Sequence, residues 1–474
     1  MNENKQQRIR DPIHDLIVFD GPGKSQLEGT LWSVLQTKPF QRLRRIKQLG
    51  FSDFVYPGAT HSRFAHSVGV FHTARLLMEI VKRETGVRQD TRENHALAAA
   101  LVHDVGHGPF SHAFEKVGKR LGLKLADHET LSEELIRSGE IADVLNKEMG
   151  KCFSDDVADI IKKNGVKTVH HAVVSSQFDA DRLDYIRRDR FMAGSQHAGI
   201  DFRWLLANLE IGKVARGVDE TQLSPVETFV IGPKAVHAAE AFVLGLFQLY
   251  PTVYFHKTTR GAEKLFEELV VRVVSLVRKD NSEATGLADR HPLVRFARNP
   301  ENPELALLLD DTVFSGSLSM MADATDPIVR EFAQRLRDRI LLKCFDVRDA
   351  ISNKIDPKCE NSQLIISAID RCCLLVKDKL TNIAASSDNV SMPRLLVDED
   401  ERSPYKDVDR TKGPLNQIMV RSGQGFVDLK VRSGVVNALQ KFKLLRVYYS
   451  KDDSEIESEI NSAITEGVAG WQKM

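Results

Sequence analysis

The stretch HALAAALVHDVGHGP, residues 95–109, decides the fold class of this chain. Its first part is rich in alanine and leucine, which are strong helix formers, and Gly108 and Pro109 end the predicted helix. His103 and Asp104 lie at the end of this otherwise apolar helix, where two ionisable neighbours cost stability unless they have partners. The stretch therefore predicts an apolar helix that ends in two partnered polar residues.

Helical patterns continue on both sides of this stretch. Residues 28–50 carry charged and apolar positions at helical spacing, and the pattern ends at Gly50. A loop is predicted over 57–64, and from His66 to Val81 apolar residues recur every three or four positions, which indicates an amphipathic helix. Further helices are predicted over 178–191 and over 234–278, the second interrupted near Pro251.

The chain is expected to form two domains, because 474 residues exceed one ordinary domain. Strand-like stretches are few before residue 300, so residues 1–300 are predicted to form a mainly α-helical core. Residues 280–304 are polar and turn-rich, which indicates a linker or long loop. Residues 301–474 are predicted to form a smaller α+β region, with a strand over 443–450 and an acidic stretch, 451–460, that leads to a short tail.

The charge of the chain is balanced. Lys plus Arg and Asp plus Glu both total 66, so nothing in the composition indicates binding to nucleic acid or to an anionic membrane. No apolar run has the length of a membrane helix, and the N-terminal stretch MNENKQQRIRDPIHD lacks the apolar core of a secretory signal. The five cysteines have no regular spacing, which argues against a disulfide framework. We therefore expect a cytoplasmic protein that does not bind membranes.

Four residues are candidate metal ligands: His66, His103, Asp104 and Asp181. Two imidazoles and two carboxylates suit a divalent ion that keeps open positions for water, and Mg, Mn, Fe and Zn all remain candidates. Ligands from separate helices are the usual arrangement in helical bundles. The alternative is that a histidine at a helix start is a surface or capping residue and that Asp181 is a solvated residue of a charged helix.

Two further groups accompany the candidate ligands. His107 follows His103 by four residues and shares its helical face, and His112 and His128 with Glu129 come soon after. Asp181, Tyr185 and Asp189 are spaced by four and line one face of a helix, so they could bind a phosphate, a sugar ring and a sugar hydroxyl in turn. The alternatives are a polar loop for the histidines and, for the helix, a salt-bridged surface face with Tyr185 packed on the core.

Taken together, these motifs resemble the HD-domain deoxynucleoside triphosphate triphosphohydrolases, and the resemblance covers most of the chain. The specific motifs are DPIH (11–14), QRLRRIKQLG (41–50), PGATHSRFAHS (57–67), LVHDVGHGPFSHAFE (101–115), DADRLDYIRRD (179–189) and YFHK (254–257).

The resemblance implies metal-dependent attack of water on the α-phosphorus, which releases a deoxynucleoside and tripolyphosphate. His66, His103, Asp104 and Asp181 match the family's metal ligands. The residues that match the catalytic group around the α-phosphate are His107, His112, His128 and Glu129, with His112 the expected proton donor to the leaving 5′-oxygen.

The same resemblance implies a binding site for the triphosphate and the deoxyribose. Arg63 would bind phosphate, Tyr185 would pack on the sugar, and Asp189 would accept a hydrogen bond from its 3′-hydroxyl. The remaining implied substrate contacts are Gln48, Leu49, Arg182, Tyr250 and Tyr254. Leu246 and Tyr250 occupy positions where the vertebrate relatives have Arg and His contacts to substrate, so the resemblance implies no base preference.

The family resemblance also implies a homo-oligomer, from dimer to tetramer or hexamer, that binds a nucleotide effector. The implied effector site consists of Arg10, Gln36, Gln41, Arg44 and Arg339. Gln36 replaces an acidic residue that reads guanine in the vertebrate members, which indicates an effector with another base. The alternative is that Gln41 and Arg44 form surface pairs on an exposed helix. The C-terminal region would then serve regulation and assembly.

Two other functions remain open at this stage. One is hydrolysis of a different phosphoester, such as a cyclic nucleotide or an alarmone. The other is a nucleotide-sensing regulatory protein, whose signature would be a lost metal ligand, and none of the matched ligands is missing here. A triphosphohydrolase is compatible with control of the dNTP pool and with antiviral defence by starvation of phage.

Overall fold

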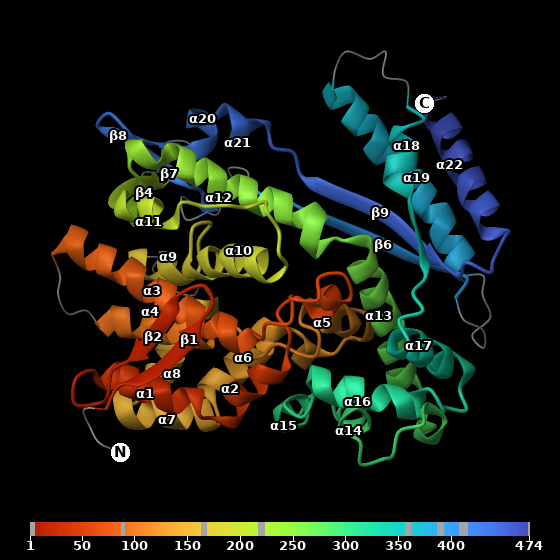
Figure 1. Cartoon of the computed structure of the whole chain (residues 1–474), viewed down its shortest axis with the longest axis horizontal. Coiled ribbons are helices and arrows are strands. Elements are labelled where there is room, and N and C mark those ends of the chain that lie inside the picture. Colours follow the sequence, from red (N-terminus) through yellow and green to blue (C-terminus); the bar gives the residue numbers. More distant parts are fainter. Residues whose placement is uncertain are drawn as a thin grey trace. The chain divides into compact units, whose positions relative to one another are not determined.

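The structure is a computed structural model that describes residues 5–86, 91–162, 168–216, 223–355, 362–385, 393–406 and 416–472 (Figure 1). Its contacts group the chain into two compact units. Unit 1 comprises Met1–Tyr254, Asn299–Val313 and Ser403–Gln440, and unit 2 comprises Phe255–Arg298, Phe314–Arg402 and Lys441–Met474. Each unit thus takes its residues from several separate stretches of the chain. The predicted division into two domains at residue 300 stays a prediction.

Unit 1 is built around helix α3 (Arg63–Thr85), which packs against α4 (Thr91–Val102) and α10 (Ala180–Met192). The Ser62 side chain caps the start of α3, and Gly86 ends the helix in the left-handed conformation, with φ of 71°. Alanines of α4 are fully buried, which lets this helix lie close to its neighbours. The first part of the decisive stretch 95–109 therefore forms a core helix. The helix ends at Val102, so its predicted extension to Gly108 was wrong, and His103 and His107 do not share a helical face.

Gly69 permits the close approach of α3 and α10. A Cβ atom at Gly69 would lie 2.2 Å from both Asp184 Oδ1 and Arg188 Nη2. Both of these side chains are fully buried on α10. A residue larger than glycine would therefore displace them.

The other helices of unit 1 surround this centre. They are α1 (Gln26–Leu35), α2 (Lys38–Arg42), α5 (His112–Leu121), α6 (His128–Arg137), α7 (Glu140–Met149), α8 (Phe153–Lys162), α9 (Val169–Val174), α11 (Phe202–Ala207), α12 (Val236–Leu249), α15 (Pro303–Ala306), α20 (Leu429–Arg432) and α21 (Gly434–Ala438).

Two small sheets complete unit 1 (Figure 1). Strands β1 (Gln7–Asp11) and β2 (Asp15–Phe19) form an antiparallel hairpin. The second sheet has the order β3-β4-β7-β8, and β4 pairs with β7 in parallel, although almost 190 residues separate the paired Val230 and Met419 in the chain. Its strands are β3 (Leu209–Arg216), β4 (Leu223–Ile231), β7 (Met419–Ser422) and β8 (Gly425–Asp428).

Unit 2 has a three-stranded antiparallel sheet of order β5-β9-β6, formed by β5 (Lys343–Asp346), β9 (Phe442–Tyr449) and β6 (Leu395–Arg402). Its core includes the buried thiol of Cys372 beside Val376, Val447 and Ile460, where the cysteine behaves as a small apolar residue. The helices of unit 2 are α13 (Lys257–Arg278), α14 (Pro292–Arg298), α17 (Pro327–Arg337), α18 (Val347–Ser352), α19 (Ser362–Ala385) and α22 (Ile456–Gln472), and α16 (Asp311–Met321) begins in unit 1 and continues into unit 2.

The predicted fold class, a mainly helical core with a smaller α+β C-terminal region, is confirmed. Several local expectations were wrong. The helical pattern over 28–50 is not continuous: α1 ends at Leu35, and Thr37 precedes the short α2, with Pro39 in its first turn. The stretch 280–304 contains α14, and the expected tail beyond residue 460 lies in α22. The hairpins β1–β2 and β3–β4 were also missed before residue 300.

Among the residues that the structure describes, no helix is both long enough and apolar enough to cross a membrane.

Candidate active site

Three of the predicted metal ligands meet in unit 1: His66 from α3, His103 directly after α4, and Asp181 from α10. Their candidate ligand atoms all lie within 4.8 Å of one another. The Oδ1 atom of Asp181 is 3.0 Å from Nε2 of His66 and 3.8 Å from Nε2 of His103. Residues that are far apart in sequence thus converge from three parts of the helical core. We call them the metal trio.

Each imidazole of the metal trio is oriented by a partner at its Nδ1 atom. Nδ1 of His66 lies 2.9 Å from Oδ2 of Asp184, and Nδ1 of His103 lies 3.0 Å from the carbonyl oxygen of Ala100. Both Nε2 atoms are buried and make no well-aligned hydrogen bond within the described chain. Buried nitrogens without such partners cost free energy, whereas an oriented imidazole with an available Nε2 is the usual metal ligand. The metal trio therefore fits a divalent ion.

The electrostatics of the metal trio also favour a cation. Burial alone would lower the pKa of His66, but its contacts with Asp181 and Asp184 raise that pKa to about 10. Burial would raise the pKa of Asp181, but the imidazoles of His103 and His66 hold it well below its usual range. Burial would raise the pKa of Asp184 too, but Arg188 and His14 hold it well below its usual range. Two ionised carboxylates, the half-buried Asp181 and the buried Asp184, therefore face His66, and their negative charge would stabilise a divalent ion.

Asp104, the fourth predicted ligand, lies beside the metal trio. Its Oδ1 atom is 3.4 Å from Nε2 of both His103 and His107, and its Oδ2 atom is 3.7 Å from Nε2 of His66. Oδ2 also accepts a hydrogen bond from the buried guanidinium of Arg63. Burial would raise the pKa of Asp104, but His103 and Arg63 hold it well below its usual range. Asp104 thus connects the metal trio to the next group of histidines.

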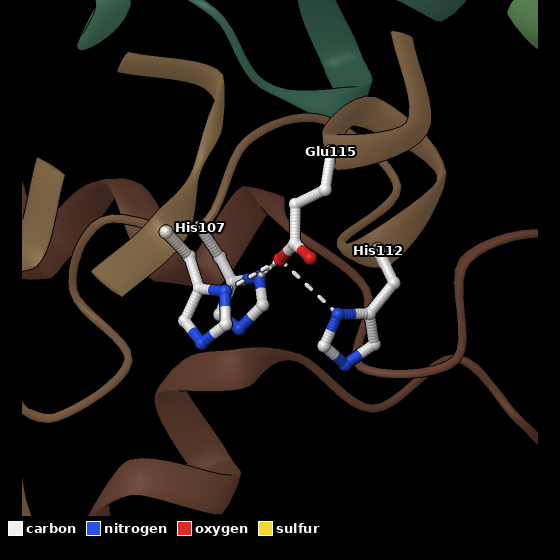
Figure 2. Close-up of side chains that lie close together, drawn as sticks. His107, His112 and Glu115 are labelled. Carbon is white, nitrogen blue, oxygen red and sulfur yellow. Dashed lines mark hydrogen bonds and ion pairs between the residues drawn. The ribbon is translucent and has the colours of Figure 1, made fainter. Parts of the chain in front are cut away.

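That group, the histidine cluster, consists of His107, His112, His128 and Glu115. Figure 2 shows the Glu115 carboxylate directed toward the rings of His107 and His112. Its Oε1 atom is 2.5 Å from Nδ1 of His128, 3.1 Å from Nδ1 of His112 and 3.6 Å from Nδ1 of His107. The rings of His107 and His128 stack with their centroids 4.0 Å apart. One carboxylate thus forms hydrogen bonds with His128 and His112 and lies close to His107.

The imidazoles of the histidine cluster differ in their pKa values. Burial and the nearby charge of Arg63 hold the pKa of His107 well below its usual range. Burial alone would lower the pKa of His128, but the hydrogen bond to Glu115 raises it. The cluster can therefore keep one imidazole neutral and another protonated at the same pH, which suits general acid–base chemistry.

Glu129 differs from the other predicted catalytic residues. It is exposed in the first turn of α6, and within the described part of the chain its carboxylate makes no contact with the histidine cluster. Glu115 is the carboxylate that contacts this cluster, and a catalytic role for Glu129 stays a prediction. The position of Glu115 three residues after His112 was the signal that sequence reasoning missed.

Beyond the metal trio, α10 carries Tyr185 and Asp189, one and two turns further along. Asp189 is buried, and its two oxygens contact Nε2 of His61 at 2.8 Å and the hydroxyl of Tyr254 at 2.9 Å. The rings of Tyr185 and Tyr254 meet edge to face with centroids 6.4 Å apart, and Tyr250 lies 6.0 Å from Tyr254. The structure therefore places three predicted tyrosines together beside Asp189.

The other predicted substrate residues have different environments. The side-chain oxygen of Gln48 is buried without a hydrogen-bond partner in the described chain, while Leu49 is half-buried. Arg63 is buried and donates to Ser111 as well as to Asp104. Arg182 is held by the carbonyl of Ser176 at 2.6 Å and by Asp179 at 2.5 Å.

The residues predicted for an effector site are mostly exposed. Arg10 pairs with Asp15 at 2.6 Å, and Gln36 is exposed at the end of α1. Gln41 accepts a hydrogen bond of 2.9 Å from Arg44, whose guanidinium lies 3.6 Å from the centre of the Phe64 ring. Arg339 belongs to unit 2. The effector site stays a prediction.

A second layer of residues behind the site was not predicted as functional. Asp184 accepts hydrogen bonds from Arg188 at 2.7 and 3.0 Å and contacts Nε2 of His14 at 2.7 Å. Arg188 also donates to Asp11 at 2.7 Å. The signals were present, since His14 lies in the DPIH motif and Asp184 follows Asp181 by three residues.

Comparisons with known proteins agree with this geometry. A family model described as the HD domain matches residues 63–187, and one described as the HD associated region matches residues 214–354. The chain is 31% identical over 344 residues to the uncharacterized protein YwfO of Bacillus subtilis, covering 72% of each chain. It is 27% identical over 377 residues to deoxynucleoside triphosphate triphosphohydrolase SAMHD1 of Mus musculus, which covers 71% of this chain and 55% of the mouse protein.

Solved structures show the same fold. A phosphohydrolase from Bacteroides thetaiotaomicron superposes with a TM-score of 0.70 at 24% identity, over 94% of this chain and 100% of the other. A hypothetical protein from Aquifex aeolicus superposes with a TM-score of 0.65 at 21% identity, over 98% of this chain and 100% of the other.

The helical core and the His/Asp cluster define a metal-dependent hydrolase of phosphate esters. The chain belongs to the HD-domain phosphohydrolases that carry an HD-associated region.

Proposed function

We propose that this protein hydrolyses deoxynucleoside triphosphates to deoxynucleosides and tripolyphosphate. The observation that carries the proposal is the arrangement along α10, where Asp181 of the metal trio is followed by Tyr185 and Asp189. Such a row presents a metal ligand, an aromatic ring and a carboxylate to the phosphate, the sugar and the 3′-hydroxyl of one nucleotide. The relatives named for this activity, from Mus musculus and others, support the same proposal.

His66, His103 and Asp181, with Asp104 beside them, would hold the divalent ion. When bound, the ion would polarise a phosphoryl oxygen and lower the pKa of a water molecule. The buried guanidinium of Arg63 adds positive charge next to Asp104, which favours the phosphate groups.

The histidine cluster would supply the proton for the leaving 5′-oxygen. His112 is the most exposed imidazole of the cluster, with 67% of its side chain accessible, and its Nδ1 faces Glu115. This contact leaves Nε2 directed away from the carboxylate, where it can donate a proton to substrate. Glu115 would stabilise the protonated ring.

Sugar selection would follow from the tyrosines and Asp189. His61 and Tyr254 fix the Asp189 carboxylate in a buried position, and it retains lone pairs for a hydrogen bond from a 3′-hydroxyl. The Tyr185 ring would pack against the 2′-carbon and leave no room for a ribose hydroxyl. The side-chain oxygen of Gln48, which is buried and has no hydrogen-bond partner among the described residues, is a further acceptor for a substrate group.

The test is incubation of the purified protein with each dNTP and each NTP in the presence of Mg²⁺ or Mn²⁺. Ion-exchange chromatography of the products should show deoxynucleoside and tripolyphosphate in equal amounts. Release of monophosphate and pyrophosphate, or equal rates on dATP and ATP, would contradict the proposal.

We propose in addition that a nucleotide effector binds at Gln41 and Arg44 and promotes a homo-oligomer. The support is the exposed Arg44 guanidinium stacked on Phe64, which lies on α3 two residues before His66. An effector phosphate on Arg44 would thus contact the helix that carries a metal ligand. Rates on single dNTPs and on pairs, together with mass measurement in solution, test this. Strictly additive rates from a monomeric protein would contradict the proposed effector site.

A further inference from the structure

The loop between α4 and α5 has an unusual backbone. Phe110 has φ of 54° and Ser111 has φ of 59°, values that residues other than glycine rarely adopt. These two residues lie directly between His107 and His112 of the histidine cluster. Strained residues of this kind persist only where the surrounding structure holds them in place, and they gather at functional sites.

Asp311 holds this loop from a distant part of the chain. Its Oδ1 atom accepts a hydrogen bond of 2.7 Å from the backbone N–H of Phe110, and its Oδ2 atom accepts one of 2.9 Å from the backbone N–H of Lys47. The side chain is buried. Hydrogen bonds to a charged acceptor are the stronger class. The carboxylate therefore fixes the strained residue directly.

Arg42 ties the same two segments together. Its buried guanidinium donates to the carbonyl of Leu309 at 2.9 Å, to that of Val105 at 3.3 Å and to that of His107 at 2.6 Å. Leu309 is two residues from Asp311. One short segment, residues 309–311, thus reaches both ends of the loop 105–111, once through Arg42 and once through its own carboxylate.

Ser111 completes the support of the loop. Its hydroxyl donates to the carbonyl of Lys47 at 2.8 Å and accepts from Nε of Arg63 at 2.8 Å. Lys47 is also the residue whose N–H binds Asp311. Phe110, through Asp311, and Ser111, through its own hydroxyl, are therefore both connected to Lys47. The hydrogen bonds of Asp311 go to Phe110 of the loop and to Lys47 rather than to the metal trio.

We propose that Asp311 is a positioning residue that holds the loop 105–111 in its strained form and thereby places His107 and His112 for catalysis. The proposal rests on the proposed function for its catalytic part. It assigns a role to the segment 309–311 within the HD-associated region, since residues 214–354 match that model. Loss of Asp311 would misplace the histidine cluster while leaving the metal trio assembled.

The neighbouring Asp310 provides a matched control. It is equally buried, but its carboxylate pairs with Nε of Arg45 at 2.6 Å and accepts from the N–H of Val313 at 3.0 Å. The comparison is therefore D311N against D310N. In D311N one amide oxygen can still accept a hydrogen bond, while the new NH₂ group faces the second backbone N–H and cannot accept from it.

Two independent readouts test the proposal, both at about pH 8 in the full-length protein. Hydrogen exchange of at least one of the Phe110 and Lys47 amides should be at least about tenfold faster in D311N than in D310N or wild type, because the amide that loses its hydrogen bond to residue 311 opens to solvent. With dNTP substrate, kcat should fall about 100-fold in D311N, as expected for a misplaced catalytic group, while KM and the Mn²⁺ dissociation constant change less than about twofold. D310N should keep the wild-type kcat.

Each outcome decides one question. Unchanged exchange at both Phe110 and Lys47 in D311N would overturn the positioning role, and so would an equal loss of kcat in D310N and D311N. If exchange accelerates only in D311N but wild type hydrolyses no dNTP, the support of the loop stands and the proposed function fails. If wild type is active and D311N keeps full kcat, the proposed function stands and the positioning role fails.

Discussion

The Nδ1 atom of His66 lies 2.9 Å from Oδ2 of Asp184, and this contact directs the other ring nitrogen of His66 toward Asp181. A carboxylate behind a ligating histidine fixes the orientation of the ring and strengthens it as a ligand. Asp184 is itself held by His14 and Arg188, so the orientation of a metal ligand depends on residues as far away as the β1–β2 hairpin.

D184N should weaken metal binding without removing any ligand. The substitution removes the charge behind His66 and lowers its basicity, so we expect the Mn²⁺ affinity to fall by about 10-fold to 100-fold. Calorimetric titration measures this. D201N, which alters the carboxylate that caps α11, is the control and should keep the wild-type affinity. Equal affinities in all three proteins would contradict the assigned role of Asp184.

Metal ions should stabilise the folded protein through the metal trio. A ligand that binds only the folded state at 100 times its dissociation constant contributes about 2.7 kcal/mol. Mn²⁺ should therefore raise the Tm of wild type, and a chelator should reverse the rise. H103A should lose the shift, whereas H237A, which removes an exposed histidine of α12, should keep it. A full shift in H103A would exclude His103 as a ligand.

The acidic partner of the histidine cluster can be identified with two conservative variants. E115Q removes the charge that contacts three imidazoles, and kcat should fall by about 100-fold, the scale of a lost general acid. E129Q changes an exposed carboxylate and should alter kcat less than about twofold. Steady-state rates at saturating substrate measure both. The reverse order of the two effects would assign the acid to Glu129.

Tyr185 should control discrimination between deoxyribose and ribose. Y185A opens space beside the sugar, so the ratio of kcat/KM for dATP to that for ATP should fall by about tenfold. Y185F retains the ring and should keep the wild-type ratio. A ratio unchanged in Y185A would show that another group excludes the ribose hydroxyl.

Asp311 should give the protein a distinctive dependence of stability on pH. Burial raises the pKa of Asp311 to about 7 from its usual 3.8, with Asp310 adding to the rise and Lys47 opposing it. Between these values the folded protein keeps a proton that the unfolded chain has lost. The free energy of unfolding should therefore decrease as the pH rises from about 4 to about 7, by at most about 1.4 kcal/mol per pH unit. Urea unfolding of wild type and D311N at several pH values checks this, and an identical slope in both would contradict it.

Sequence reasoning found the residues whose motifs are local. His103 and Asp104 stand out because they lie at the end of an apolar helical pattern, and Asp181, Tyr185 and Asp189 stand out because they share a helical face. Glu115, three residues after His112, could have been found by the same helical spacing. The class of fold followed from the same periodic patterns.

Contacts between distant segments could not be predicted in this way. Nothing in the spacing of LLDDTVF shows that Asp311 binds the N–H of Phe110, because 201 residues separate them. The pairing of β4 with β7 likewise joins segments that are far apart in the chain, and no local pattern predicts it. Tertiary contacts decide such features, and a single sequence shows only local preferences.

The parallel pairing of β4 with β7 has a consequence for biosynthesis. Unit 1, which holds the metal trio, also includes Ser403–Gln440, and the side chain of Gln177, just before α10, forms hydrogen bonds with the backbone of Lys406 and of Asn416. During translation these residues leave the ribosome only after most of the chain has been synthesised. Unit 1 is therefore completed late, although its first residues are made early. Until then the edge of β4 is open to pairing with other chains, a period in which a chaperone would be most useful.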